Sequence, residues 1–252
     1  MVEMNDKEIE AIGTVLADRL YAYRLLHVAY GAKTDQEIVE ALCSEQTAGV
    51  FTRLSDLSPA KSIYLKTYDA GEEITVRVDQ AIGGMGAFGH ELSIRLSDPS
   101  YMDELGSIYT KLFDVPGPSY VSPWESPYLG TDNMLFKEST IDVRRRYAER
   151  GYRAVAYKHF PEDHISMMLD FMAQLSARSF DAFADSDDES FEKLLLCQVD
   201  FLSSHMGDWL KDFHRELCMK DESGVFAELA EIMRAFIIVD KQIAGSLAEA
   251  CR

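Results

Sequence analysis

The sequence predicts an all-α fold, arranged as a single helical-bundle-like domain over residues 1–252. Apolar side chains recur every three or four residues from Ile9 to Ala250, the spacing that places them along one face of a helix. Only one short segment alternates in the manner of a strand, and no repeat, low-complexity tract or linker divides the chain. The sequence therefore indicates helices packed on helices.

Three helices and one strand are predicted in the first third of the chain. A second helix is expected over residues 35–43, and a third around residues 58–68, where Pro59 suits the first turn and Ser58 suits the N-cap. The segment 73–78 alternates weakly and is the one strand-like piece. The first helix is predicted from the apolar stripe of Ile9, Ile12, Leu16, Leu20 and Tyr23.

Helices alternate with loops in the predicted middle of the chain. Residues 101–113 have helical periodicity, which the Pro-Gly-Pro sequence at 116–118 ends because proline cannot continue a helix. A loop is expected over residues 122–129. Residues 142–150 form the next predicted helix, and Gly151 is placed as its C-terminal stop.

The last third of the chain is predicted to contain the most regular helices. Asp163 can cap a helix that follows Pro161. The acidic segment 181–192 is predicted to be a solvated loop and helix start, and two strongly amphipathic helices are expected over residues 191–217 and 225–250. One face of the first helix is more typical of a core than of a ligand site, and His205 and Gln198 lie beside it. This face is formed by Phe201, Leu202, Met206, Trp209, Phe213 and Leu217.

The charge balance restricts the possible partners. Lys and Arg number 25 against 43 Asp and Glu, a formal net charge of −18. Phosphate backbones are bound by a surplus of Lys and Arg, so this balance argues against a nucleic-acid partner. It is compatible with a role in solubility or with a basic partner such as an arginine-bearing peptide.

The cellular location is predicted from three features that the sequence does not have: a secretory signal, a membrane span and paired cysteines. The first residues have neither the basic region nor the apolar run of a secretory signal, and no stretch approaches the roughly 20 apolar residues of a membrane span. The four cysteines contain no CxxC pair and are widely scattered, which suits a reducing compartment better than a disulfide frame or a zinc site. We therefore expect a cytoplasmic protein without a membrane span.

Two motifs in the sequence could bind a cofactor or a metal ion. The run G-M-G-A-F-G at 84–89 matches the dinucleotide pattern GxGxxG, but it lacks the βαβ setting that the pattern requires, so a mobile loop is preferred. His159, Asp163 and His164 could form a metal cluster, although Pro161 interrupts any helix that would align them. We expect no bound metal and no cofactor.

Catalysis is not predicted either. The chain has no GxSxG elbow and no cysteine in a nucleophile context, so no catalytic residue is assigned. The three consecutive arginines at 144–146 suggest phosphate binding at first, but they fall in an amphipathic helix. A solvated helix face is the preferred interpretation.

Several segments follow a recognisable order from about 101 to 217. They include Y-T-K-L-F at 109–113, P-W-E-S-P-Y at 123–128, F-P-E-D-H-I at 160–165 and Q-V-D-F-L-S-S-H-M-G-D-W at 198–209. Together they resemble the TorD/DmsD family of redox-enzyme maturation proteins, whose motifs are Y-x-x-L-F, P-x-E-S-x-Y, the hinge signature E-P-x-D-H-I followed by E-L-x-F, and Q-x-x-F-L-x-x-H-L-x-x-W. Two positions depart from the family pattern: His159-Phe160 precede the proline of the hinge signature, and Met168 replaces the Glu of E-L-x-F.

The resemblance implies an all-helical chaperone with a hinge near the Pro-x-Asp-His motif, at about 151–164. It implies binding of a twin-arginine signal peptide and of the apo form of a molybdopterin-dependent oxidoreductase, whose cofactor insertion and proofreading the chaperone would assist before export. The expected oligomeric state is a monomer or a homodimer that exchanges helices around the hinge. The signal-peptide and client-binding residues it suggests are Tyr109, Phe113, Pro123, Trp124, Glu125, Ser126, Tyr128, Pro161, Asp163 and His164.

Two other functions remain open at this point. A helical metal- or nucleotide-dependent enzyme would use the adjacent Asp163 and His164. An interaction protein without specificity for signal peptides would need neither of them.

Overall fold

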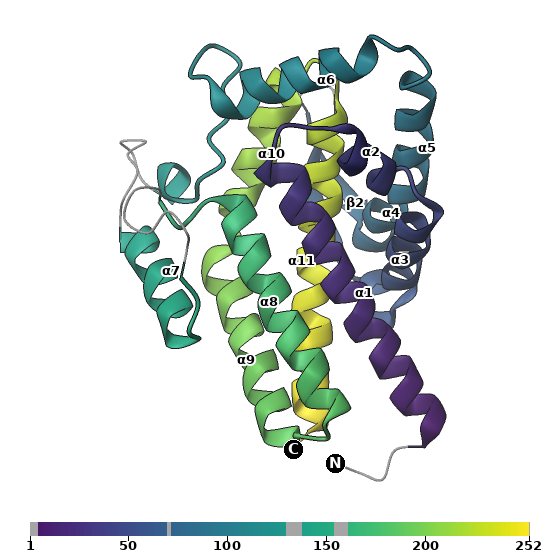
Figure 1. Ribbon diagram of the computed structural model, residues 1–252, viewed down its shortest axis with the longest axis vertical. Helices are drawn as coiled ribbons and strands as arrows, with labels where there is room; N and C mark the ends of the chain where they lie inside the picture. The colour runs from purple at the N-terminus through teal and green to yellow at the C-terminus, as the bar shows by residue number, and fades with distance from the viewer. Residues whose placement is uncertain (1–4, 70–71, 130–137, 154–160, 252) are drawn as a thin grey trace.

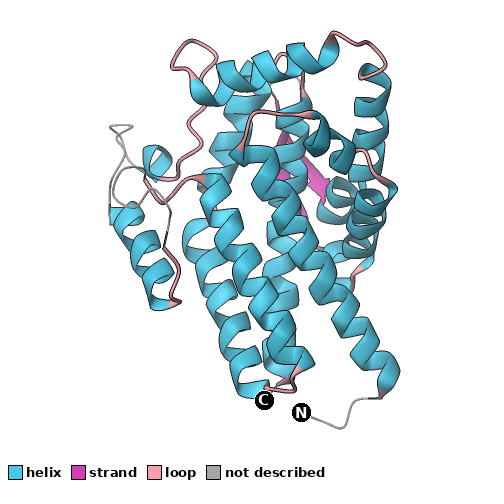
Figure 2. Cartoon of the chain, viewed as in Figure 1, coloured by secondary structure: helices cyan, strands magenta, loops and turns pink. Residues whose placement is uncertain are grey.

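The computed structural model describes residues 5–69, 72–129, 138–153 and 161–251 (Figure 1). The all-α prediction is confirmed, since helices make up most of these residues and their only sheet is a two-stranded hairpin (Figure 2). Among the same residues, no helix is both long and apolar enough to cross a membrane.

Four long helices run side by side and form the main bundle (Figure 1). Helix α1 packs on α8, α8 packs on α9, and α9 packs on α11. The predicted first and last helices are confirmed, and the core side chains that they bury include Leu16, Tyr23 and Phe236. The bounds of the four helices are α1 Asp6–Gly31, α8 Ile165–Ala184, α9 Asp188–His205 and α11 Val225–Ala250.

A buried polar network joins these four helices. The Arg19 guanidinium donates to Asp240, with Nε 2.5 Å from Oδ1, and to Gln198, with Nη2 2.7 Å from Oε1. The Tyr23 hydroxyl donates to Oδ2 of Asp240 at 2.6 Å, and the Gln198 amide donates to the Ser179 hydroxyl at 2.7 Å. Arg19, Gln198 and Asp240 are each 0 % exposed, so the network fixes the helices against one another deep in the core.

Smaller helices and the hairpin cover the α1 and α11 side of the bundle. The helix predicted over 35–43 corresponds to α2, of which Asp35 is the N-cap, and the strand predicted at 73–78 corresponds to β2. The sequence did not indicate α3, which packs on α1 and α4. The bounds are α2 Gln36–Leu42, α3 Glu45–Asp56, β1 Tyr64–Asp69, β2 Glu72–Arg77, α4 Val78–Gly83 and α5 Met85–Arg95.

The helix predicted around 58–68 is wrong. Ser58–Ser62 form a short 3₁₀ turn whose N-cap is Leu57 and not Ser58, and the chain then enters β1. In β1, Leu65 and Thr67 are buried while Tyr64 and Lys66 are exposed. This alternation is the period of a strand, which the prediction missed.

The prediction that the glycine run at 84–89 is a mobile loop is wrong. Gly86 and Gly89 lie within α5, and Gly84 is its N-cap. Glycine is required at position 89, because a Cβ there would lie 2.8 Å from the carbonyl oxygen of Leu42. The glycine therefore allows α5 to approach the backbone at the end of α2. The preceding strands are antiparallel, so no βαβ unit surrounds the motif.

The predicted helix over 101–113 is confirmed as α6, Tyr101–Tyr109, continued by a π-helical turn at Thr110–Asp114. The helix predicted over 142–150 corresponds to α7, Glu138–Glu149. Gly151 follows it with φ +72°, the left-handed conformation expected of a helix stop.

The single helix predicted over 191–217 is wrong, because the chain breaks it into α9 and α10, Trp209–Lys220. The indole Nε1 of Trp209 donates to the carbonyl oxygen of His205 at 2.7 Å, which satisfies an acceptor that the break exposes. The acidic loop is also shorter than predicted, since α8 extends to Ala184 and Asp187 caps α9.

The buried ion pair between Arg19 and Asp240 gives the first prediction. Asp240→Ala should lower the free energy of unfolding by about 3–5 kcal/mol, because it leaves a buried guanidinium without its counterion. Glu189→Ala is the matched control, because that carboxylate pairs with Lys193 on the surface. The control should change stability by less than about 1 kcal/mol. Urea denaturation of both variants measures the difference, and equal effects would contradict the structural role of the pair.

Candidate functional site

The loop over 122–129 and the segment 161–165 lie side by side in the structure. The Ile165 amide donates to the carbonyl oxygen of Pro123 at 2.8 Å, and the Glu125 amide donates to the carbonyl oxygen of Asp163 at 3.0 Å. Trp124 and His164 form an antiparallel bridge between them. The loop over 122–129 is therefore held against the start of α8 by backbone hydrogen bonds.

Asp163 binds the loop and α7 together. Its side chain is 0 % exposed, and Oδ2 accepts from the Ser126 amide at 2.8 Å while Oδ1 accepts from the Thr140 hydroxyl at 2.9 Å. Its predicted role as the cap of α8 is wrong, because its carboxylate points to these other donors. His164 is the N-cap instead, with Nδ1 accepting from the Ser166 amide at 3.2 Å.

His164 is a neutral, partly buried side chain. Burial, together with the nearby His27, lowers the pKa of His164 to about 4. Its ring packs edge-on against Trp124, with centroids 5.0 Å apart and planes at 81°. Because Nδ1 accepts a hydrogen bond, the proton of the neutral ring is on Nε2.

These contacts argue against the enzyme that would use Asp163 and His164. The carboxylate oxygens of Asp163 and the Nδ1 atom of His164 already accept hydrogen bonds from the protein. The described residues contain no group of three or more His, Cys, Asp or Glu side chains that could hold a metal ion. His159, the third member of the imagined cluster, lies outside the described residues.

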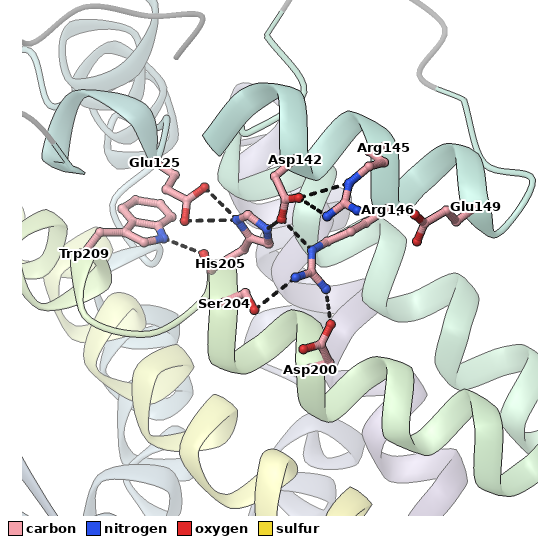
Figure 3. A network of polar contacts seen from close by, with 9 residues as sticks. All are labelled: Glu125, Asp142, Arg145, Arg146, Glu149, Asp200, Ser204, His205 and Trp209. Carbon is pink, nitrogen blue, oxygen red and sulfur yellow. Dashed lines mark hydrogen bonds and ion pairs between the residues drawn. The ribbon is translucent and has the colours of Figure 1, made fainter. Parts of the chain in front are cut away.

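His205 joins the loop to α7 and α9 (Figure 3). Its Nδ1 lies 3.1 Å from Oε2 of Glu125, and its Nε2 lies 2.8 Å from Oδ2 of Asp142. A carboxylate only accepts hydrogen bonds, so both contacts are made when the ring is protonated. Burial lowers the pKa of His205, but the two carboxylates outweigh it and raise that pKa above the ordinary value. The resemblance singled out Glu125 and the segment that contains His205, but nothing in the sequence indicated that they pair or that Asp142 joins them.

The arginines of α7 correct another expectation. Arg145 is exposed, as a solvated helix face requires, but the side chains of Arg144 and Arg146 are only 27 % and 18 % exposed. Arg144 donates two hydrogen bonds to Glu162, from Nε at 2.7 Å and from Nη2 at 2.6 Å. Arg146 pairs with Asp142 and with Asp200 of α9 (Figure 3).

The remaining predicted site residues lie in or against the aromatic core. The Tyr128 hydroxyl donates to the carbonyl oxygen of Ser122 at 2.9 Å, and its ring lies 5.5 Å from that of Trp209. Tyr109 and Phe113 are buried, with ring centroids 5.1 Å apart. Trp124 and Tyr128 are partly buried, whereas Pro123, Glu125, Ser126 and Pro161 are buried. Direct contact of these residues with a peptide stays a prediction.

Two cavities flank α7. One, of about 360 Å³, is lined by Tyr147, Tyr152 and Glu162 among others. The other, of about 370 Å³, lies between α7 and α9 and is lined by Arg146, Cys197 and their neighbours. Arg144 lines the first cavity and Arg146 lines the second, so each of the two paired arginines lies beside one cavity.

Comparison with known proteins gives consistent matches. The family model described as nitrate reductase delta subunit matches residues 85–215, slightly more than half of the chain. The chaperone protein TorD of Vibrio parahaemolyticus is 22 % identical over 189 residues, covering 73 % of this chain and 83 % of the relative. The TorD of Vibrio vulnificus strain YJ016 is 23 % identical over 205 residues, covering 78 % and 94 %. The TorD of Shewanella sp. strain ANA-3 is 24 % identical over 231 residues, covering 89 % and 92 %.

The carboxylate of Asp163 gives the second prediction. Asp163→Ala leaves the Ser126 amide and the Thr140 hydroxyl without an acceptor, and each buried unsatisfied group costs about 1–3 kcal/mol. We expect a larger loss of unfolding free energy than from Thr140→Val, which removes one of the two bonds. Chemical denaturation measures both variants. A loss no greater than that of Thr140→Val would mean that the carboxylate does not anchor the loop.

The raised pKa of His205 gives a pH-dependent prediction. The stabilisation by the protonated ring is fully present below the unfolded pKa of about 6.5 and is lost as the pH rises through the higher folded pKa. The wild type should therefore exceed His205→Gln in unfolding free energy most at low pH, and the difference should shrink as the solution becomes alkaline. His90→Gln, at an exposed histidine, is the control and should show no such trend. A difference that grows with pH would refute the protonated state.

Proposed function

Because the chain belongs to the nitrate reductase delta subunit family and has TorD chaperones as relatives, we propose that it is the system-specific chaperone of a molybdoenzyme. It is a chaperone of this family and not an enzyme. In this proposal it binds the twin-arginine signal peptide and the apo form of a molybdopterin-dependent oxidoreductase. It acts in the cytoplasm, where it assists cofactor insertion and proofreading before export.

The observation that carries the proposal is that hydrogen bonds join two segments, distant in the sequence, into one frame. The loop over 122–129 and the residues at 161–165 carry the sequence resemblance to the family, and the hydrogen bonds of Asp163 join them across 37 residues of sequence. A frame of this kind can present a binding loop in one conformation, which lowers the entropy that is lost when a peptide binds.

Within this frame the predicted residues take two roles. Asp163, Glu125 and Ser126 are buried and hold the loop in place. Trp124 and Tyr128 are only partly buried, so they are the members of the set that can offer apolar surface to a peptide. The net charge of −18 favours the approach of a segment that carries paired arginines.

Burial of apolar side chains has to supply most of the affinity. Exposed ion pairs contribute about 0.2–1 kcal/mol each, so two arginines paired on the surface supply about 2 kcal/mol at most. A micromolar complex needs about 8 kcal/mol. Each well-buried Leu or Phe of the peptide contributes about 1.5–3 kcal/mol, so three or four of them are required.

We further propose that the chain is a monomer or a homodimer that exchanges helices around a hinge at about 151–164. Part of this segment, 154–160, lies outside the described residues. The proposal rests on the family resemblance and on the ease with which hinge loops allow identical elements to exchange between protomers.

The proposal predicts how a leader peptide binds. The probe is a synthetic peptide with an arginine pair followed by a leucine-rich stretch, titrated into the full chain by isothermal calorimetry. Replacing its central leucines by serines should abolish binding, because burial supplies most of the affinity. In a Trp209→Phe variant, which leaves Trp124 as the sole tryptophan of the chain, the fluorescence should change on binding of the native peptide. Equal affinity of the serine peptide would contradict the proposal.

A further inference from the structure

Helix α7 carries three consecutive arginines in a chain that is otherwise strongly acidic. Two of them pair with carboxylates outside the helix. Arg144 pairs with Glu162, just before α8. Arg146 pairs with Asp200 of α9 (Figure 3). Arg145 pairs only within α7 among the described residues, with Asp142 and Glu149. Through these two ion pairs, α7 binds carboxylates that belong to other parts of the protein.

Glu162 has the features of an acceptor for a guanidinium group. Its side chain is 1 % exposed, and both of its oxygens accept from Arg144, at 2.6 and 2.7 Å. This parallel pair of bonds matches the fork of an arginine and cannot be made by a lysine ammonium. A buried carboxylate without such a partner is strongly disfavoured, so Glu162 requires an arginine in place.

An apolar face accompanies this acceptor. Thr140, Val143 and Tyr147 are the buried side chains of α7, and the rest of the helix lies at the edge of the molecule (Figure 1). The Tyr147 ring lies 4.5 Å from that of Phe171 in α8 and 6.2 Å from that of Phe201 in α9. The position that α7 fills therefore accepts one arginine, Arg144, together with an aromatic residue three positions later on the same helical face.

Resting on the function proposed above, we propose that α7 occupies the receptor for an arginine-bearing segment of the client's leader. Glu162 accepts one leader guanidinium when α7 is displaced, and Asp200 lies where it can accept the second. The face of Phe171 and Phe201 receives an apolar residue of the leader. In this arrangement α7 is a placeholder that keeps the buried carboxylate paired while no client is bound.

A peptide with the sequence of α7, Glu138–Glu149, tests the receptor without any client. Fluorescence anisotropy of the labelled peptide with the full chain should show weak binding to the wild type, because the tethered helix competes at high effective concentration. Arg144→Ala should tighten binding at least about tenfold, because it raises the fraction of chains with a vacant receptor. Arg145→Ala, at the exposed arginine of the same helix, is the matched control and should leave the affinity unchanged.

Glu162→Gln should weaken peptide binding in both the wild-type and the Arg144→Ala backgrounds, since the amide cannot accept both bonds. If Arg144→Ala does not fold, as judged by circular dichroism, Arg144→Lys replaces it with a smaller expected gain. Equal affinities of the Arg144 and Arg145 variants would overturn the proposal. Self-association of the Arg144 variant without peptide binding would assign the receptor to α7 of a second copy and would also overturn it.

The leader peptide then distinguishes the two proposals. It should displace the labelled α7 peptide from the Arg144 variant, and its own affinity should rise in that variant. If the α7 peptide binds but the leader does not displace it, the assignment of the receptor to the leader fails. If the leader binds the wild type with an affinity that neither Arg144→Ala nor Glu162→Gln changes, the placeholder role fails while the chaperone function stands.

Discussion

The buried carboxylate of Asp163 joins three parts of the molecule that no continuous helix connects. It accepts hydrogen bonds from the loop at Ser126 and from α7 at Thr140, and its own backbone leads directly into α8. Since a fully buried carboxylate is tolerated only when donors surround it, these segments have to assemble together. The position of the loop, of α7 and of the His205 contacts all follow from this assembly.

The same constraint operates in the bundle core, where Arg19 and Asp240 lie at zero exposure. Hydrophobic side chains of similar volume would often stabilise a core as well as such a pair does. What the ionic network adds is direction, because the two charges, Gln198 and Tyr23 satisfy one another only in one axial alignment of the helices.

The parts of the fold that could be predicted from the sequence are those whose residue pattern is set within a single helix that packs against the core. The stripes of α1 and α11 and the glycine stop after α7 belong to this group, since each is local. Some of the failures involve contacts between distant segments, as at Gly89, where a side chain would meet the backbone at the end of α2. Others are local, such as the strand alternation missed in β1 and the helix break after His205, whose carbonyl oxygen accepts from the indole of Trp209. The site shows the same division. The resemblance singled out Glu125 and the segment that contains His205, but it indicated neither their pairing nor the contact of His205 with Asp142 of α7.

The charges of α7 also explain why this helix, and not one of the long ones, is suited to exchange with a ligand. Val143 and Tyr147 are its buried apolar anchors, and at about 1.5–3 kcal/mol each they stabilise its position by a few kcal/mol. A leader with three or four apolar anchors gains more than this. The pairing of Glu162 is conserved in the exchange, because one guanidinium replaces another and no buried charge is left alone at the end. Because α7 stays tethered and competes for the same position, it offsets part of the free energy that the leader gains, which favours the later release of the client.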